Sequence, residues 1–476
     1  MSFISPEYII FFSIVLPLFF WMPHRYRWML LLVMSYFFYA YGNIQYVPLI
    51  AFSTIVDYIA ARMIHRSEAE SERRLWLAAS IIVNLGVLFF FKYFNFFNES
   101  SAAVLGYTPF THNLVLPIGI SFYTFQSMSY TIDVFRRKMD AEPHLGIMAT
   151  YVAFFPQLVA GPIERATNLL PQFHVKKLFN EDRAVAGLQQ ILWGFFKKVV
   201  IADRIAIYVN AVYNNVDDHS GWTLIIATFF FAFQIYCDFS GYSDIAIGTA
   251  KIMGFDLMQN FRQPYFSQSI REFWTRWHIS LSTWFRDYVY YPLGGNRVPL
   301  LRNLSNLLIV FLVSGLWHGA GWTFVIWGAL HGAGVVLIVL LRHFKIEIMS
   351  GKSLLMLVLR VVVTFVFVDF AWIFFRANSF ADAQYVVSHL FVFDGSNIFA
   401  PFEGALLGIQ TEFYLSFVLI GFLILVDAFD VKLSLERFLI RVPLVPRWGA
   451  YWLLGAAVIF SGLYGSGAGQ FIYFQF

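Results

Sequence analysis

Long apolar runs are the feature that most limits what this chain can fold into. Such runs recur from one end of the chain to the other, for example at 75–97, 184–207 and 222–248. Charged residues make up only 13% of the chain, against roughly 25% in ordinary soluble domains. A helix needs about 20 apolar residues to cross a bilayer, and only helices or closed barrels satisfy their backbone there. The sequence therefore predicts an all-α polytopic integral membrane protein.

The number of runs and the lack of other features set the expected organisation. We expect about 11–13 transmembrane and re-entrant helices, because several runs are shorter than a perpendicular crossing requires. The chain contains no repeat, no low-complexity tract and no soluble stretch, so residues 1–476 are predicted to form a single domain. The apolar runs lie at 8–21, 28–41, 46–60, 75–97, 114–132, 145–161, 184–207, 222–248, 304–318, 322–341, 354–375, 413–428 and 448–465. The first run lacks the charged flank and cleavage site of a signal peptide and is interpreted as a retained span.

Basic loops alternate with loops that contain no Lys or Arg. Residues 62–74 and 136–138 are basic, whereas 42–45 and 98–113 lack both residue types. Because short basic loops stay in the cytoplasm, this alternation orients the chain. Continued to the end, it places 251–302 on the cytoplasmic side and both termini outside.

Residues 145–180 fit this count only if part of the segment enters the membrane and returns. The stretch Phe154–Pro162 contains the Pro and Gly interruptions that such a dip requires. We therefore predict a re-entrant segment there.

Several classes of function are disfavoured by what the sequence lacks. Cys237 is the only cysteine, so a disulfide framework or a Cys-based metal site is excluded. The chain has no P-loop and no His-Glu-x-x-His motif. The sequence predicts chemistry without a metal or bound ATP. The net charge of +4 is explained by cytoplasmic loops rather than by a nucleic-acid partner.

Polar residues interrupt the apolar pattern within 271–288. If this segment is one helix, Arg271, Thr275, His278 and Ser282 lie near one face. Ionisable residues at membrane depth are functional-site hypotheses by default. The alternative is an interfacial anchor whose charges are solvated.

Two further histidines lie within apolar runs. His318 ends the run 304–318, between Gly315 and Gly319, and a function there is favoured over a purely structural role. His331 lies in the next run, where a helix-packing role suffices.

Charged residues also occur in two other runs. Asp238 and Asp244 lie in 222–248, and Lys197, Lys198 and Asp203 lie in 184–207. Mutual ion pairing is one interpretation and a polar pathway for a donor or acceptor is the other.

Seven segments of the chain, some of which contain the residues described above, together resemble the membrane-bound O-acyltransferase family, specifically its bacterial branch. That branch contains alginate O-acetylation proteins, the peptidoglycan O-acetylation membrane subunit and the teichoic-acid D-alanylation protein. The resemblance covers the chain from about residue 5 onward. The segments that carry it are Leu116–Phe122, Phe155–Pro162, Gly194–Asp203, Asp238–Asp244, Asn260–Phe266, Phe273–Tyr288 and Ser314–Gly319.

The resemblance implies a helical bundle around a central passage, with acyl transfer across the membrane. His318 matches the signature histidine at the constriction, and His278 matches a second active-site histidine. His318 would act as the base that activates a hydroxyl, while His278 would orient the donor or stabilise the oxyanion. The residues expected to line the passage are Arg276, Ser282, Asp238, Asp244 and His331.

The same resemblance implies the participants in the reaction. No tightly bound cofactor is expected, and acetyl-CoA is the expected donor. The expected partners are a polysaccharide acceptor and a periplasmic or membrane-anchored acetyltransferase that delivers the acetyl group. The expected location is the bacterial inner membrane, and no nucleic acid is involved.

The C-terminal stretch Phe471–Phe476 resembles the C-terminal peptide of the small partner in the D-alanylation system. In that peptide a tyrosine is proposed to carry the acyl group, so Tyr473 is a candidate acyl relay. The alternative is an aromatic belt at the membrane interface.

Two other functions stay open at this point. A transporter or flippase of an acyl donor or lipid-linked glycan needs a polar passage but not the chemistry of His318. D-alanyl transfer to teichoic acid is the other alternative, although the basic 286–302 loop is more similar to the alginate-type proteins.

Overall fold

The computed structural model describes residues 1–112, 115–158, 161–346, 348–349, 351, 353–395, 397–403, 405, 407–433, 442–464 and 471–474. Over these residues the chain forms helices, turns and irregular segments and contains no strand. The predicted all-α class is confirmed.

Nine helices in the described part of the chain are long and apolar enough to cross a membrane, which confirms a polytopic membrane protein. They are Ile44–Arg66, Glu70–Leu105, Glu181–Tyr213, Gly221–Ile252, Leu300–His318, Trp322–His343, Leu354–Arg376, Ile409–Val431 and Leu444–Ser461. Other predicted runs fall on shorter helices. The run 114–132 becomes α6 (Ile120–Phe135), whose 16 residues are almost all buried. The predicted central passage stays a prediction.

Two compact units divide the chain. The first contains Met1–Ile191 and Tyr242–Gln259, and the second contains Leu192–Gly241 and Asn260–Phe476. The prediction of a single domain stays a prediction.

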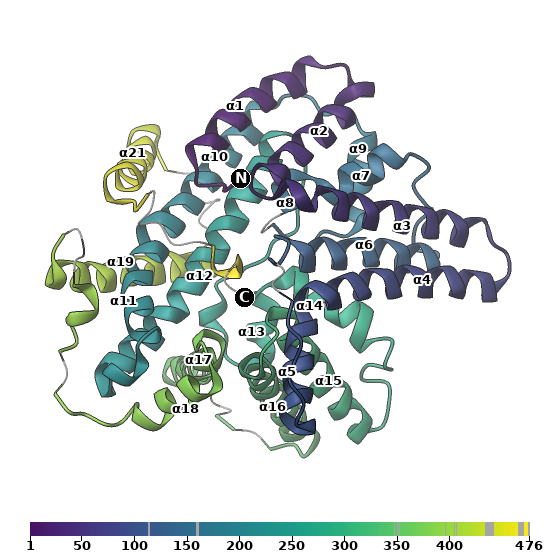
Figure 1. The fold of residues 1–476 in the computed structure, drawn as a ribbon. Helices are drawn as coiled ribbons and strands as arrows, with labels where there is room; N and C mark the ends of the chain where they lie inside the picture. The colour runs from purple at the N-terminus through teal and green to yellow at the C-terminus, as the bar shows by residue number, and fades with distance from the viewer. Residues whose placement is uncertain are drawn as a thin grey trace. The chain divides into compact units, whose positions relative to one another are not determined.

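The first unit contains the first ten helices, the last of them in part, together with the end of α12 (Gly221–Ile252) from Tyr242 onward. The ten helices are α1 (Pro6–Trp21), α2 (His24–Asn43), α3 (Val47–Arg66), α4 (Glu70–Leu88), α5 (Phe94–Leu105), α6, α7 (Leu145–Ala153), α8 (Phe155–Leu158), α9 (Ala166–His174) and most of α10 (Glu181–Phe195). Figure 1 shows α3, α4 and α6 packed side by side. A buried carboxylate joins them, because Asp57 of α3 accepts hydrogen bonds from Ser80 and Asn84 of α4 and from Ser127 of α6.

The segment predicted to re-enter the membrane is buried and interrupted. α7 ends at Ala153, α8 covers only Phe155–Leu158, and helix resumes at Ala166. Val159 and Ala160 lie outside the described residues. The Pro and Gly pattern thus correctly indicates broken helix here, and the depth of the segment in the bilayer stays a prediction.

The second unit carries the long helices of the C-terminal half. They are α11 (Asp203–Tyr213), α12 (Gly221–Ile252, to Gly241), α13 (Ile270–Arg276), α14 (Ile279–Phe285), α15 (Leu300–His318), α16 (Trp322–His343), α17 (Leu354–Arg376), α18 (Phe380–His389), α19 (Ile409–Leu433) and α21 (Leu444–Ser461). A π-helical segment, η3 (Phe196–Ala202), joins α10 to α11.

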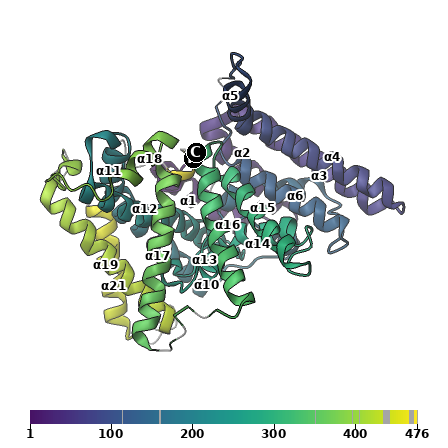
Figure 2. The same ribbon diagram turned by 90° about the horizontal axis from the view of Figure 1, so that it is seen from below.

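Helices α15 and α16 lie side by side (Figure 2), and glycines let them approach closely. A Cβ atom at Gly315 would overlap the carbonyl oxygen of Phe324 and lie 3.4 Å from the Cα of Gly328. A Cβ at Gly328 would lie 3.3 Å from the Cα of Gly315. Backbone therefore packs on backbone one turn before His318, and this contact fixes where that histidine lies.

We expect Gly315→Ala to destabilise the protein by about 1–3 kcal/mol, because the added methyl group overpacks this crossing. Any chemistry that depends on His318 should slow as well, because α15 carries this histidine. Thermal unfolding in detergent measures the first effect. Gly421→Ala is the matched control, since a Cβ at Gly421 meets nothing within 4 Å. Equal unfolding temperatures for the two variants would contradict the close packing.

Candidate active site

His278 lies at a break between two helices, not within one. α13 ends at Arg276, α14 begins at Ile279, and His278 has φ +42°, in the left-handed region that residues other than glycine seldom adopt. Asn260 holds this break: its carbonyl accepts from Ile279 N–H at 2.9 Å, and its side-chain oxygen accepts from the Ser280 hydroxyl at 2.6 Å. The prediction of one helix with Arg271, Thr275, His278 and Ser282 on a face is therefore wrong.

The two histidines singled out by the sequence lie together in the second unit. His318 is the last residue of α15, and its ring centroid lies 6.2 Å from that of His278. Both side chains are buried, with 2% of His318 and none of His278 exposed. Two residues 40 positions apart thus form one buried histidine pair.

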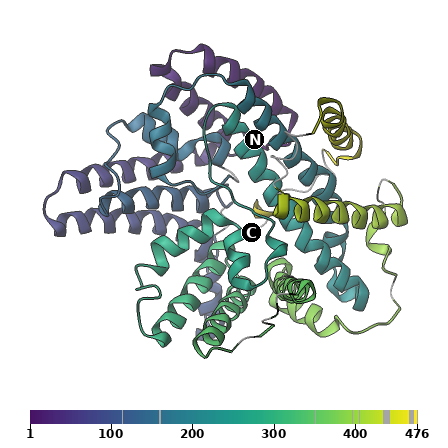
Figure 3. The same cartoon turned by 180° about the vertical axis from the view of Figure 1, so that it is seen from behind.

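Tyr473 contacts both rings of this pair. Its ring centroid lies 5.6 Å from His318 and 6.3 Å from His278. Phe239 of α12 supports the arrangement, with its ring 4.6 Å from His278 and 4.7 Å from Tyr473. In Figure 3 the letter C marks the end of the chain, and the C-terminal segment lies beside it. The phenol and two imidazoles form a three-membered cluster.

Aromatic side chains enclose this cluster. Trp317 lies 4.9 Å from His318 and 5.9 Å from His278, measured between ring centroids. Trp327 of α16 and Phe375 of α17 lie 5.0 and 5.3 Å from His318. Phe375 is a neighbour that sequence reasoning missed, because one more phenylalanine in an apolar run carries no signal.

His331 contacts Trp327, the same tryptophan that contacts His318. Its ring centroid is 4.9 Å from that of Trp327, and its Nδ1 accepts a hydrogen bond from Trp274 Nε1 at 3.3 Å. These contacts fit the helix-packing interpretation of His331. Its expected role in lining a passage stays a prediction.

Arg276 and Ser282 make local contacts. Arg276 forms an ion pair with Glu272, one turn earlier in α13, at 2.7 Å. The Ser282 hydroxyl donates to the carbonyl oxygen of Trp277 at 3.2 Å, which helps to hold the break at His278. Their expected contact with a donor stays a prediction.

The two carboxylates of α12 have different surroundings. Asp238 forms an ion pair with Lys198 at 2.7 Å and accepts a hydrogen bond from the backbone N–H of Ile472 at 2.6 Å. Lys198 also pairs with Asp203 at 2.7 Å, so the ion-pairing interpretation is confirmed there. Asp244 belongs to the first unit and accepts from Gln190 at 3.0 Å.

Burial sets the charge state of His278. Desolvation lowers the pKa of its imidazole from 6.5 to about 3. The ring is therefore neutral throughout the physiological pH range, in the form that can donate one hydrogen bond and accept another.

This shift makes stability depend on pH. Below pH 6.5 the unfolded chain protonates His278 while the folded chain does not, so stability is complete above that pH and decreases as the pH falls. At pH 5 the loss amounts to about 2 kcal/mol. We expect the unfolding temperature in detergent to fall less between pH 7.5 and pH 5 for His278→Asn than for the unmodified chain. Identical pH dependence in both proteins would contradict a neutral, buried His278.

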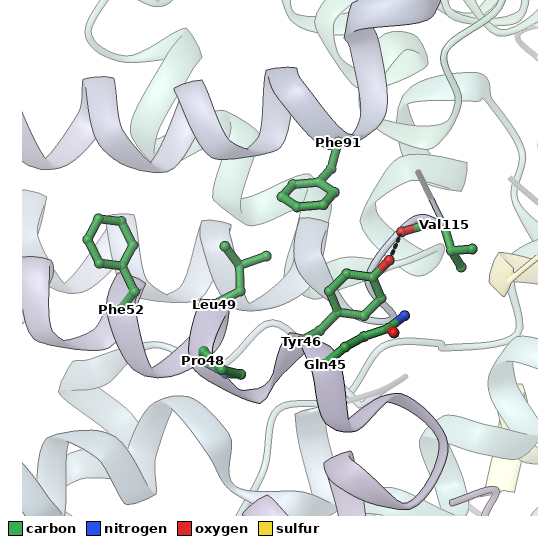
Figure 4. Close-up of a pocket in the computed structure, with 7 residues that line it drawn as sticks. All are labelled: Gln45, Tyr46, Pro48, Leu49, Phe52, Phe91 and Val115. Atoms are coloured by element: carbon green, nitrogen blue, oxygen red, sulfur yellow. Dashed lines mark hydrogen bonds between the residues drawn. The ribbon is translucent and has the colours of Figure 1, made fainter. Parts of the chain in front are cut away.

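A pocket of about 600 Å³ in the first unit has a different character. Figure 4 shows it between the start of α3 and the π-helical segment Phe89–Tyr93, which carries Phe91. On one side of the pocket the Tyr46 hydroxyl donates to the carbonyl oxygen of Val115. Its lining residues are Gln45, Tyr46, Pro48, Leu49, Phe52, Phe91 and Val115. This lining provides apolar surface and no general base, so the histidine pair is the better candidate for a catalytic centre.

The apolar helices and the buried histidine pair define a multi-pass membrane protein with a candidate catalytic centre. A model of the MBOAT, membrane-bound O-acyltransferase family matches residues 79–375. The chain belongs to this family and is an O-acyltransferase.

Bacterial relatives support the same assignment. Probable alginate O-acetylase AlgI of Azotobacter vinelandii is 42% identical over 390 residues, which cover 81% of this chain and 76% of that protein. Peptidoglycan O-acetyltransferase of Helicobacter pylori is 36% identical, with 77% of this chain and 74% of that protein covered. Teichoic acid D-alanyltransferase of Bacillus subtilis is 28% identical over 56% of this chain and 71% of that protein.

Proposed function

We propose that this protein moves an acetyl group from cytoplasmic acetyl-CoA across the inner membrane for O-acetylation of a cell-envelope or secreted polysaccharide. The observation that carries the proposal is the contact of Tyr473 with the two buried histidines, His278 and His318. The relatives named for alginate and peptidoglycan O-acetylation support acetyl as the group and a polysaccharide as the acceptor.

His318 acts as the general base in this proposal. A hydroxyl attacks the thioester carbonyl carbon poorly unless a base removes its proton as the new C–O bond forms. His318 takes that proton, the C–S bond breaks, and the departing thiolate receives the proton to leave as CoA thiol. The neutral His278 ring provides a hydrogen-bond donor that orients the thioester or stabilises the oxyanion.

The hydroxyl attacked first is that of Tyr473. Its ring centroid lies 5.6 Å from that of His318 and 6.3 Å from that of His278, so its phenol is next to both histidines. The product of the first step is an acetyl ester on Tyr473. A hydroxyl of the glycan, or of a delivering partner, then attacks this ester, the bond to the phenol oxygen breaks, and the phenol regains a proton.

The acceptor side of the proposal has two participants. A periplasmic or membrane-anchored acetyltransferase collects the acetyl group, and a polysaccharide receives it. In this division the partner selects the glycan. Similar membrane proteins can then act on different glycans, as the names of the alginate and peptidoglycan relatives indicate.

The donor and its side are tested with membrane vesicles and isotopically labelled acetyl-CoA, which does not cross membranes. Inside-out vesicles present the cytoplasmic face and should form protein-bound or glycan-bound acetyl ester. Right-side-out vesicles should not. Label incorporated only in right-side-out vesicles would overturn the proposed direction.

The same vesicles separate an enzyme from a transporter or flippase. A transporter leaves the acyl–sulfur bond intact and accumulates the labelled donor in the lumen, whereas the enzyme releases free CoA thiol. Labelled D-alanine supplied on its carrier tests the alternative suggested by the teichoic acid D-alanyltransferase. Transfer of D-alanine with no transfer of acetyl would replace the proposed substrate.

A further inference from the structure

We infer that Asp238 is a positioning residue, which anchors the C-terminal segment 471–474 so that the Tyr473 phenol stays against the histidine pair. This inference rests on the proposed function for its catalytic consequence. The anchor itself is a direct contact across 234 positions of sequence, from the Asp238 carboxylate to the backbone N–H of Ile472.

A buried charge cluster holds the carboxylate in place. Lys198 lies between Asp203 and Asp238, with its Nζ 2.7 Å from one oxygen of each. All three side chains are at most 3% exposed. One oxygen of Asp238 is thus directed to Lys198 while the other accepts from Ile472 at 2.6 Å. Hydrogen bonds to charged groups are stronger than those between neutral groups, which suits an anchor for a short segment.

The π-helical segment η3 provides a second attachment for the C-terminal part of the chain, at Leu463, before the segment 471–474. The N–H of Asp203, the residue that follows η3, donates to the carbonyl oxygen of Lys198, five residues earlier. The carbonyl of Val199 accepts from the N–H of Leu463 at 3.0 Å. Single turns of π-helix occur frequently at functional sites. Here one such segment provides both Lys198 and the Val199 carbonyl to the C-terminal part of the chain.

Arg204 attaches the end of α21 to the same region. Its guanidinium forms an ion pair with Glu412 of α19 and donates to the carbonyl oxygen of Ser461 at 2.6 Å. The chain that leaves α21 is therefore held at Ser461 and Leu463, and held again at Ile472. Residues 465–470 and 475–476 lie outside the described residues.

The anchor determines where the phenol lies. Phe471 and Ile472 are each 1% exposed, and Phe471 contacts Phe239 at 5.9 Å between ring centroids. Because Tyr473 directly follows the anchored amide, its ring reaches the same Phe239 and both histidines. Without the Asp238 contact, the segment loses the hydrogen bond that holds the Ile472 amide and thereby the position of the Tyr473 ring.

The test is the variant Asp238→Asn in the full-length protein, in detergent or vesicles. An amide has one acceptor oxygen, so the substituted side chain cannot satisfy both Lys198 and the Ile472 N–H. Hydrogen–deuterium exchange should accelerate in the peptide that contains Ile472. The kcat of acetyl transfer should fall by about 10- to 100-fold, with the KM for acetyl-CoA changed less than about twofold.

Two further variants make the result specific. Asp256→Asn is the control, because Asp256 pairs with Arg183 in an exposed setting and the same substitution there should change neither readout. The triple variant Lys198→Met, Asp203→Asn, Asp238→Asn removes the charges and leaves the introduced amide oxygen free to accept from the Ile472 N–H. It should recover slow exchange and most of the kcat.

The outcomes are distinguishable from failure of the proposed function. Exchange at Ile472 that stays unchanged in Asp238→Asn would overturn the anchor, whatever the activity. If Asp238→Asn does not fold, fast exchange at Ile472 in the triple variant would overturn the anchor instead. Full activity of Tyr473→Phe would refute the acetyl relay, while the exchange measurement would still report on the anchor.

Discussion

Replacing His318 by Gln is expected to lower the rate of acyl transfer by about 10²- to 10⁴-fold, the range that a positioned general base contributes. Gln keeps a polar side chain of similar size but cannot take up and return a proton near neutral pH. The three aromatic neighbours of His318, which are Trp317, Trp327 and Phe375, provide no other base. The substitution therefore removes the proton acceptor. The measurement is the initial rate of CoA thiol release at equal protein abundance.

His331→Gln is the matched comparison in the next helix. Its ring contacts Trp327 as His318 does, and its bond from Trp274 can be accepted by a Gln oxygen. We expect a loss of less than about tenfold for this variant, since it removes no proton-transfer group. Equal losses in the two variants would mean that packing around Trp327, rather than base catalysis, limits the rate.

Tyr473→Phe is expected to reduce acetyl transfer to the glycan to the background level. The substitution retains the ring that packs on Phe239 and removes only the oxygen that receives the acetyl group. The measurement combines glycan-bound acetate with mass spectrometry of the C-terminal peptide. In the unmodified chain, with the acceptor withheld, acetyl should accumulate on Tyr473.

Tyr464→Phe is the control for loss of a tyrosine hydroxyl near the same end of the chain. The Tyr464 hydroxyl donates to the carbonyl oxygen of Val458, near the end of α21. Its removal should cost at most a typical hydrogen bond and leave acetyl transfer intact. Unimpaired transfer by Tyr473→Phe, with no acetyl on Tyr473, would refute the relay while leaving His318 as base for direct transfer.

The sequence was sufficient for the fold class because lipid imposes a simple rule. Apolar runs in a chain with few charges become helices, and the described helices follow the runs closely from 184–207 onward. The importance of His278 and His318 could be predicted for the same reason, since buried imidazoles in apolar surroundings are retained at an energetic cost. Their proximity could not be derived from periodicity, because it depends on how the break at His278 packs against the end of α15.

Other features of the site depend on contacts that local sequence does not encode. The pattern of 271–288 is compatible with one helix, yet Asn260 breaks it at His278 by bonding Ile279 and Ser280. The carboxylate of Asp238 was ambiguous between ion pairing and a polar pathway. Its bond to Ile472 is a long-range backbone contact that no spacing rule predicts.

The measurement that tests the central claim most directly is ester-linked acetate on cell-envelope and secreted glycans. It compares cells that carry the unmodified chain with cells that carry His318→Ala at equal membrane abundance. We predict that acetate disappears from one glycan fraction, which would establish O-acetylation and identify the acceptor. Unchanged acetate in every fraction would contradict the claim that this protein transfers acetyl groups through His318.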